Sequence, residues 1–201
     1  MEHVSRETLH QLEAYAALLC KWNQRINLIG RTTESELWDR HIWDSYQLLE
    51  LLPATVSTLA DFGSGGGLPG LVLAIARPGL VVTLVERDQR KAAFLTQTVM
   101  TLALPNVSVR ATPIETIDQR YDVITARALA SLTELCSLSY PRLLATGFCL
   151  FPKGANFATE LAEAKTMWDF AHHEIPSKTH DVAQIISLSQ LTPRQAGEQS
   201  A

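Results

Sequence analysis

Glycines crowd the segment DFGSGGGLPG, residues 61–70, which lies between two apolar runs. Because glycine lacks a Cβ atom, it adopts positive φ readily and lets a ligand approach the backbone closely. The amides at the start of a following helix can face an anionic group, either a pyrophosphate or a carboxylate. A P-loop is excluded because no Gly-Lys-Ser/Thr follows. The segment therefore predicts a turn that holds part of a nucleotide-like ligand.

One interpretation of the glycine spacing is the dinucleotide fingerprint G-x-G-x-x-G. It is present at Gly65, Gly67 and Gly70, but it begins two residues late relative to the end of the preceding strand and contains Pro69. In the correct register the pattern begins at Gly63 and Gly65 and then meets Leu68 in place of a third glycine. A dinucleotide site is therefore a weak interpretation that stays open.

An acid at the end of the next strand would bind a ribose. The segment VVTLVERD supplies Glu86 at that place, and Asp88 follows in the same turn. An S-adenosylmethionine site uses the same geometry, with the glycine turn at the amino-acid end of the cofactor and the strand-end acid at the ribose hydroxyls. After the third strand, TPIET offers Ile114 for stacking on adenine and Glu115 for a polar contact. The alternative is that both glutamates are solvated acids at strand ends.

Two parts of the chain with different sequence patterns must position these residues. Residues 5–29 and 35–52 have the apolar spacing of amphipathic helices, and from about Ser57 short β-rich runs alternate with helical ones. This alternation predicts a doubly wound α/β fold with a mostly parallel sheet. We expect a helical extension over 1–53 packed on a Rossmann-like core over 54–201, as one compact unit. Within the core, FATELAEAKTMWDF (157–170) is expected to be helical, AQIISLSQL (183–191) to be the last strand, and RQAGEQSA (194–201) to be frayed.

Composition limits the classes of protein that fit. The 201 residues are 46% hydrophobic and 19% charged, which suits one domain with a buried core. The N-terminus lacks the apolar region of a signal peptide and no run is long enough to cross a bilayer, so we expect a cytoplasmic protein. Cys20, Cys136 and Cys149 form no C-x-x-C pair, which argues against a disulfide framework or a zinc site. The net charge of −4 argues mildly against a general nucleic-acid binder.

Six motifs together resemble one family. They are WNQRINL (22–28), HIWDS (41–45), DFGSGGGLPG, VERDQRKAAFL, ARALASL with Arg127, and FPKG with Lys153, in order from Trp22 to Gly154. This set is similar to the bacterial 16S ribosomal RNA guanine-N7 methyltransferases, the glucose-inhibited division protein B family. One departure is the last strand, where HDVAQIISLSQL has Asp181 at a position that is usually basic in the family.

The resemblance implies a fold, a reaction and a set of contacts. The fold would be that of class I S-adenosylmethionine-dependent methyltransferases with an N-terminal helical extension. The reaction would be methylation of guanine N7 in the decoding-region loop of 16S rRNA. The substrate would be this RNA within the small ribosomal subunit or its precursor. The cofactor contacts implied by motif position, together with Gly65 from the glycine turn and Glu86 from the ribose argument, are Gly63, Gly65, Leu68, Glu86, Ile114, Glu115 and Arg127. We further expect a monomer without a membrane segment or a metal ion.

The choice of acceptor can also be argued from chemistry. Enzymes that methylate exocyclic amines have an Asn/Asp-Pro-Pro-aromatic motif after the fourth strand, whereas this chain has Asp122 to Ala128, DVITARA, without a proline pair. Methylation at C5 of a pyrimidine needs a nucleophilic cysteine, but Cys136 lies in an apolar helix and is expected to be buried. A ring nitrogen is favoured by elimination, and guanine N7 is one. Its free lone pair needs no catalytic base, so we expect no general base among the site residues.

Further polar residues are candidates for substrate contacts, namely Asn23, Asn27, His41 and Lys153. His41 and Asp44 are three residues apart and share one helix face, so they could equally brace the helices. The planar donor fork of Arg127 suits a carboxylate, a phosphate or a guanine edge, and it could instead pair with a strand-end acid or position the substrate. His172 and His173 lack partners at the spacing of metal ligands.

Two other functions remain compatible with these residues. One is methyl transfer to a small-molecule acceptor, which suits the negative net charge. The other is a non-catalytic nucleotide-binding module, because a fold does not determine a function.

Overall fold

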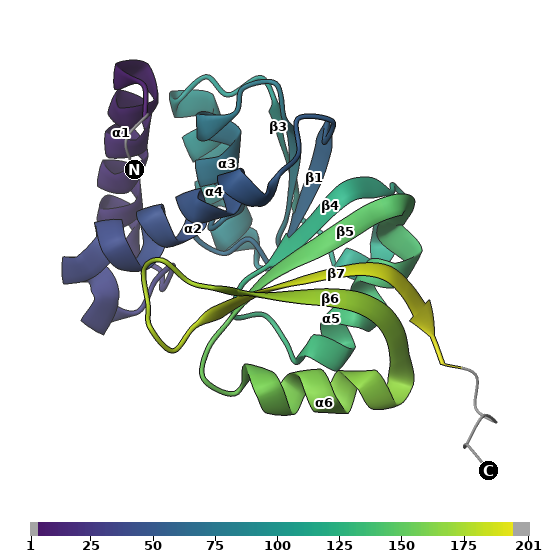
Figure 1. The fold of residues 1–201 in the computed structure, drawn as a ribbon. Helices are drawn as coiled ribbons and strands as arrows, with labels where there is room; N and C mark the ends of the chain where they lie inside the picture. The colour runs from purple at the N-terminus through teal and green to yellow at the C-terminus, as the bar shows by residue number, and fades with distance from the viewer. Residues whose placement is uncertain (1–3, 195–201) are drawn as a thin grey trace, which may run out of the picture.

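The computed structural model describes residues 4–194. Of the tail 194–201 that was predicted to be frayed, residues 195–201 lie outside the described residues. Over residues 4–194 the chain forms one seven-stranded sheet in the order β3-β2-β1-β4-β5-β7-β6 (Figure 1). The strands are β1 (Thr58–Phe62), β2 (Val81–Val85), β3 (Val107–Arg110), β4 (Tyr121–Ala126), β5 (Leu143–Lys153), β6 (Trp168–Pro176) and β7 (Gln184–Pro193). Strands β1 to β5 pair in parallel, while β7 pairs antiparallel with β5 and β6. The prediction of a doubly wound, mostly parallel α/β fold is confirmed.

Helices cover both faces of this sheet. They are α1 (Arg6–Asn23), η1 (Arg31–Glu36), η2 (Trp38–Trp43), α2 (Asp44–Tyr46), η3 (Gln47–Leu51), α3 (Gly70–Ala76), α4 (Gln89–Thr101), η4 (Ile114–Thr116), α5 (Leu132–Ser139), η5 (Tyr140–Arg142) and α6 (Phe157–Met167). One buried cluster joins α1, α3 and α4 to the sheet, and a second joins α5 and α6 to it. In Figure 1, α1, α3 and α4 accordingly lie together, apart from α5 and α6. The boundary expected near residue 53 stays a prediction, because the first cluster includes residues on both sides of it.

The first predicted helix, 5–29, is too long. Ser5 caps α1 by accepting a hydrogen bond from the amide of Thr8, but α1 ends at Asn23. There the Asn23 side-chain oxygen accepts hydrogen bonds from the amides of Leu28 and Ile29, at 2.9 and 3.0 Å. A polar side chain that satisfies backbone amides in a turn competes with continuation of the helix.

The second predicted helix, 35–52, is also different in detail. Residues 31–51 form a series of short helical pieces, with the π-helix η2 and the α-helical turn α2 between the 3-10 helices η1 and η3. The extra residue per turn in a π-helix shifts which side chains face inward. As a result His41, Ile42 and Ser45 are all buried.

The prediction of a helix over 157–170 was correct for most of this range but wrong at its C-terminal end. Helix α6 stops at Met167, and Trp168 begins β6, a strand that the sequence pattern did not predict. Strand β6 pairs with β7 from Trp168↔Pro193 to Pro176↔Gln184, and its inward-facing side chains are few. An edge strand with one solvated face lacks the continuous apolar run by which the central strands were recognised.

Candidate functional site

Two cavities lie at the carboxyl ends of the parallel strands, next to the pair β1 and β4. The strand order reverses between these two strands, which is where ligands bind in open α/β sheets. We name the cavities after one residue each, the Gly63 cavity and the Arg127 cavity. Their volumes are about 380 and 480 Å³, within the range of about 300–1,000 Å³ that is usual for small-ligand sites.

The Gly63 cavity brings together most of the predicted cofactor residues. Its lining residues are Gly63, Val85, Glu86, Arg87, Asp88, Lys91, Thr112, Pro113, Ile114, Glu115, Ala128, Leu129, Ala130, Glu134 and Leu138. Four different strand ends thus contribute to one cavity, through the residues that follow β1, β2, β3 and β4. Gly65 and Leu68 are not among the lining residues, and Leu68 is buried in the core beneath the turn.

Gly63 needs to be glycine for two reasons. Its φ is +64°, in the left-handed region, and a Cβ atom there would lie 2.6 Å from Cδ1 of Leu129. Leu129 is itself a lining residue of the Gly63 cavity. A side chain at position 63 would therefore strain the backbone and force Leu129, a lining residue, to move.

Glu86 closes the glycine turn from the side of β2. It is buried, with Oε2 accepting a hydrogen bond from the amide of Gly65 at 2.9 Å and Oε1 accepting one from the amide of Asp88 at 2.8 Å. A carboxylate has about four lone-pair sites, so each oxygen can accept one further hydrogen bond. Glu86 can therefore hold the turn and still bind a diol, which fits a ribose.

Asp61 is an acid beneath the glycine turn that no sequence pattern indicated as part of the site. Asp61 is fully buried at the end of β1 and accepts hydrogen bonds from the Thr125 hydroxyl at 3.0 Å and from the amide of Gly70 at 3.1 Å. Burial raises the pKa of Asp61 to about 6, against the opposing effect of these hydrogen bonds. Position 70 leaves room only for glycine, because a Cβ atom would lie 2.8 Å from both Cβ and Oδ2 of Asp61.

The Arg127 cavity is assembled from segments that lie far apart in the sequence. Its lining residues are Thr33, Arg40, His41, Asp44, Arg127, Ala128, Ala130, Pro152, Lys153, Gly154, Ala155, Glu160, Ser177, Thr179, His180, Val182, Ala183, Gln184 and Ile185. The N-terminal helices, the end of β4, the end of β5 with the start of α6, and the β6–β7 turn all contribute.

Arg127 is held by the N-terminal helices. Its guanidinium donates hydrogen bonds to the carbonyl of Arg40 at 3.2 Å, to Oδ2 of Asp44 at 3.2 Å and to Nδ1 of His41 at 3.0 Å. The strand-end partner considered for Arg127 is therefore replaced by an acid from a different part of the chain. Arg127 lines this cavity and not the Gly63 cavity, although the resemblance implied a cofactor contact.

His41 has a single protonation state that fits its neighbours. Arginine only donates, so Nδ1 of His41 accepts, and Nε2 carries the proton and donates to Thr33 Oγ1 at 2.8 Å. Burial, with Arg127 as a second cause, lowers the pKa of His41 to about 4. A neutral His41 therefore orients Arg127 at neutral pH, and a substrate contact by His41 stays a prediction.

Lys153 lies across the Arg127 cavity, where it is fixed by two acceptors. Its Nζ donates to Oε2 of Glu160 at 2.7 Å and to the carbonyl of Ala130 at 2.8 Å. Glu160 was not singled out in the sequence, because an acid in an amphipathic helix looks like a solvated residue. The structure places it in the cavity wall.

The two asparagine candidates lie elsewhere. Asn23 stabilises the turn after α1, and its side-chain nitrogen donates to Glu34 at 3.1 Å. Asn27 is exposed, and neither asparagine is a lining residue of the two cavities. A substrate role for either one stays a prediction.

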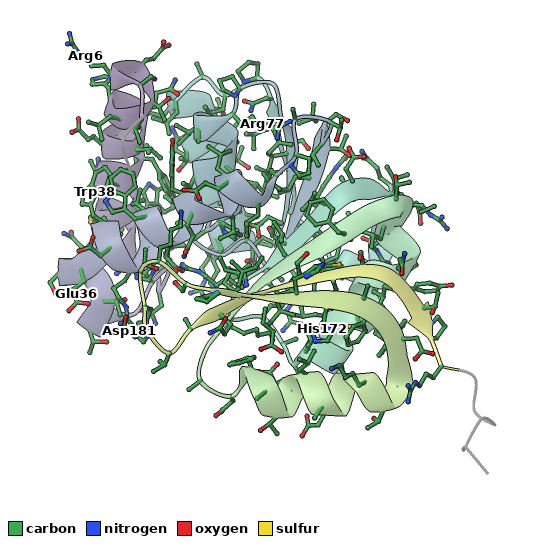
Figure 2. All side chains as sticks on the ribbon, in the orientation of Figure 1. Arg6, Glu36, Trp38, Arg77, His172 and Asp181 are labelled. Atoms are coloured by element: carbon green, nitrogen blue, oxygen red, sulfur yellow. The ribbon has the colours of Figure 1, made fainter. Side chains whose placement is uncertain are left out.

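The β6–β7 turn is the part of the site that no sequence signal indicated. Thr179 donates to Oδ1 of Asp44 at 2.7 Å, and the amide of Lys178 donates to the Gln47 side chain at 2.8 Å. Figure 2 shows Asp181 of this turn on the same side of the molecule as Glu36 and Trp38 of the N-terminal helices. These contacts join residues more than 130 positions apart, so the N-terminal helices and the C-terminal hairpin close one wall together.

Ala128 and Ala130 line both cavities, so the cavities adjoin along this loop. Ala128 has a φ of +53°, which an alanine adopts only when its surroundings impose it. Such strained residues are concentrated at functional sites. The arrangement could place one ligand in each cavity with their reacting atoms meeting at the shared loop.

Three other expectations concern residues outside this wall. Cys136 is fully buried, and burial raises its pKa to about 12, so it is a core residue as predicted. Over residues 4–194, no group of three or more His, Cys, Asp or Glu side chains could hold a metal ion. In the same range no helix has the length and apolar character needed to span a membrane.

Comparison with known proteins gives consistent matches along the chain. A family model described as rRNA small subunit methyltransferase G (GidB) matches residues 8–186. A protein named ribosomal RNA small subunit methyltransferase G from Cereibacter sphaeroides is 52% identical over 194 residues, covering 94% of this chain and 93% of that protein. The protein of the same name from Gluconobacter oxydans is 47% identical over 190 residues, covering 94% of this chain and 97% of that protein.

Solved structures of other methyltransferases share the fold. The glycopeptide N-methyltransferase MtfA, complexed with S-adenosylmethionine, aligns with a TM-score of 0.61 at 9% identity, covering 74% of this chain and 93% of that chain. A ribosomal protein L11 methylase from Lactobacillus delbrueckii aligns with a TM-score of 0.57 at 15% identity, covering 76% of this chain and 77% of that chain. At such identities the likeness is one of fold alone.

Proposed function

Because the chain belongs to the rRNA small subunit methyltransferase G family, we propose that it methylates N7 of one guanine in the decoding-region loop of 16S ribosomal RNA. Membership of this family makes the chain an S-adenosylmethionine-dependent methyltransferase. The proposal concerns the base, the atom and the residues that bind them. We further propose that the enzyme acts as a cytoplasmic monomer on the small ribosomal subunit or its precursor.

The observation that carries this proposal is the pair of adjoining cavities. The Gly63 cavity fits the cofactor, because it has a glycine floor, a carboxylate with lone pairs available for a diol, and the apolar side chain of Ile114. When bound, the cofactor supplies an activated methyl group on a sulfonium. The Arg127 cavity, which shares Ala128 and Ala130, would receive the guanine after it leaves its stack.

The chain's own residues position the two reactants. Methyl transfer from a sulfonium is an in-line displacement, in which alignment of the reactants can be worth roughly 7–11 kcal/mol. The lone pair of guanine N7 forms the new bond while the sulfur keeps the electron pair of the broken bond, so no proton has to leave. The purine becomes cationic, and Asp44 keeps the nearby Arg127 charge balanced at 3.2 Å. None of these residues needs to act as a general base.

Cations at the rims of the cavities support an RNA substrate in spite of the net charge of −4. Arg40 lines the Arg127 cavity, and Arg87 and Lys91 line the Gly63 cavity. Of the three, Arg40 lies in the cavity proposed for the guanine, and Arg87 and Lys91 lie in the adjoining cavity proposed for the cofactor. Their positions are compatible with a local basic surface on an acidic protein.

The test is methyl incorporation from labelled S-adenosylmethionine into small ribosomal subunits, naked 16S rRNA and a metabolite extract. We expect label in RNA, and digestion with mass spectrometry should identify 7-methylguanine. Single-turnover rates should not rise tenfold per pH unit, because no proton is abstracted. Label confined to metabolites would favour the small-acceptor alternative, and a methyl group on an exocyclic amine or ring carbon would exclude the N7 assignment.

A further inference from the structure

The acids of the Arg127 cavity differ in what they can still bind. Of the described residues that line it, two are acids, Asp44 and Glu160. Asp44 is occupied on both oxygens, since Oδ1 accepts from Gln47 at 2.9 Å and from Thr179 at 2.7 Å, and Oδ2 accepts from Arg127 at 3.2 Å. Asp44 therefore belongs to the framework of the cavity and has little capacity left for a ligand.

Glu160 is fixed through one oxygen only. Its Oε2 accepts hydrogen bonds from Lys153 Nζ at 2.7 Å and from the amide of Leu132 at 2.8 Å. Within residues 4–194, no backbone or side-chain group donates a hydrogen bond to Oε1. The side chain of Lys153 is only 10% exposed and is also tied to Ala130, so it cannot easily turn away from Glu160. The carboxylate is thus oriented, with both lone pairs of Oε1 available.

We propose that Oε1 of Glu160 determines specificity for guanine by accepting hydrogen bonds from N1–H and the N2 amino group of the target base. This inference rests on the proposed function, because it assigns the base-recognition contact of the same cavity. A flipped base is commonly recognised by hydrogen bonds to its Watson–Crick edge. Guanine has two adjacent donors on that edge, whereas adenine presents an acceptor at N1, which a carboxylate repels.

The same contact leaves the reacting atom free. N7 lies in the five-membered ring, away from the edge that carries N1–H and the N2 amino group. A guanine held at Glu160 by its Watson–Crick edge therefore keeps N7 unobstructed, and the cavity that would hold it adjoins the Gly63 cavity at Ala128 and Ala130.

A structural role accounts for Oε2, whereas Oε1 belongs to a side chain that is 27% exposed and is open to water or to a ligand. The amide of Leu132 is in the first turn of α5, where Ser131 already caps the helix by accepting from the amide of Glu134 at 3.3 Å. The ion pair with Lys153 likewise uses Oε2. Because Lys153 balances the charge, covering Oε1 with a neutral base does not bury an unpaired anion.

The experiment compares guanine with inosine, which lacks the N2 amino group, at the target position of reconstituted small subunits. The unmodified enzyme should prefer guanine over inosine by roughly fivefold to a hundredfold in kcat/KM, the range for one discriminating contact. In Glu160→Gln the preference should fall to about one, because the amide group of glutamine would donate toward the donors of guanine. Glu163→Gln, an exposed neighbour on α6, is the matched control and should keep the original preference.

Two outcomes would overturn the assignment. One is an unmodified enzyme that methylates inosine and guanine equally well, a result that does not depend on the folding of any variant. The other is a Glu160→Gln variant with unchanged affinity for S-adenosylmethionine and an unchanged preference for guanine. Failure of the unmodified enzyme to form 7-methylguanine in guanine-containing subunits would instead contradict the proposed function itself.

Discussion

The Gly63 cavity and the Arg127 cavity are neighbours, but they are built in different ways. The lining residues of the Gly63 cavity lie between positions 63 and 138, mainly in the turns that follow successive parallel strands. Those of the Arg127 cavity extend from Thr33 to Ile185 and include both ends of the fold. The first depends on local backbone geometry, and the second depends on how distant segments pack.

This difference predicts different consequences of mutation. Changes in the glycine turn should mainly affect affinity for the cofactor, because the turn is its contact surface. Changes around Arg127 should mainly affect turnover. His41 and Asp44 orient the guanidinium of Arg127, and none of these residues lines the Gly63 cavity. Four measurements test this difference between the two cavities, beginning with the largest expected effect.

Gly63→Val should abolish measurable binding of S-adenosylmethionine. A β-branched residue at a φ of +64° adds strain of about 1–3 kcal/mol, and its Cβ atom would clash with Leu129, which lines the cavity. Isothermal titration calorimetry on folded protein gives the affinity. Gly79→Val is the control, because position 79 is exposed and a Cβ atom there has no neighbour within 4 Å. Unchanged affinity in a folded Gly63→Val variant would mean that this cavity does not bind the cofactor.

Arg127→Ala should lower kcat/KM for the small subunit by roughly tenfold to a hundredfold, the value of one charged hydrogen bond from Arg127 to the substrate. Affinity for S-adenosylmethionine should change much less, because Arg127 does not line the Gly63 cavity. Single-turnover kinetics and calorimetry separate the two effects. Arg194→Ala removes an exposed arginine that pairs with Asp169 and serves as the control. If cofactor affinity fell as much as the rate, Arg127 would be a cofactor contact, as the resemblance implied.

Glu86→Ala should weaken binding of S-adenosylmethionine by about 1.5–3 kcal/mol, the value of a charged hydrogen bond. The same change also frees the amide of Gly65, so the glycine turn should become less ordered. Hydrogen exchange at Gly65, measured together with the dissociation constant, reports both effects. NADH binding more tightly than S-adenosylmethionine to the unmodified protein would favour the dinucleotide interpretation.

The smallest effect concerns the pH dependence of stability, where Asp61 beneath the glycine turn and His41 of the Arg127 cavity act with opposite signs. The pKa of Asp61 is raised from 3.8 to about 6, so the folded state binds more protons in this range and loses stability as pH rises through it. The pKa of His41 is lowered from 6.5 to about 4, so the unfolded state binds more protons and stability is lost as pH falls through that range.

Thermal unfolding between pH 4 and 6.5 tests these signs. Relative to the unmodified protein, Asp61→Asn should gain stability as pH rises and His41→Gln should gain stability as pH falls, each by a few degrees in Tm. Asparagine can still accept from the amide of Gly70 and donate to Thr125, so the first variant should fold. Parallel pH profiles for all three proteins would contradict the opposite signs.

Much of the Gly63 cavity could be predicted from sequence because its parts follow strand ends. Gly63 and Glu86 each come directly after an apolar strand, Ile114 and Glu115 lie in the turn after β3, and parallel strands bring their carboxyl ends to one edge. The same logic predicted the doubly wound sheet. It missed Asp61, because a buried acid at the end of an apolar strand gives no sign of whether it faces the core or a ligand.

The Arg127 cavity could not be predicted in this way. Sequence alone identified Arg127, His41 and Lys153 as candidates from residue type and placed His41 and Asp44 on one helix face. Only the tertiary structure decided that Asp44 pairs with Arg127, that Thr179 completes the acid's contacts, and that Glu160 faces the same space. The physical reason is that periodicity and turn chemistry act over a few residues, whereas these contacts are fixed by packing between segments separated by as many as 135 positions.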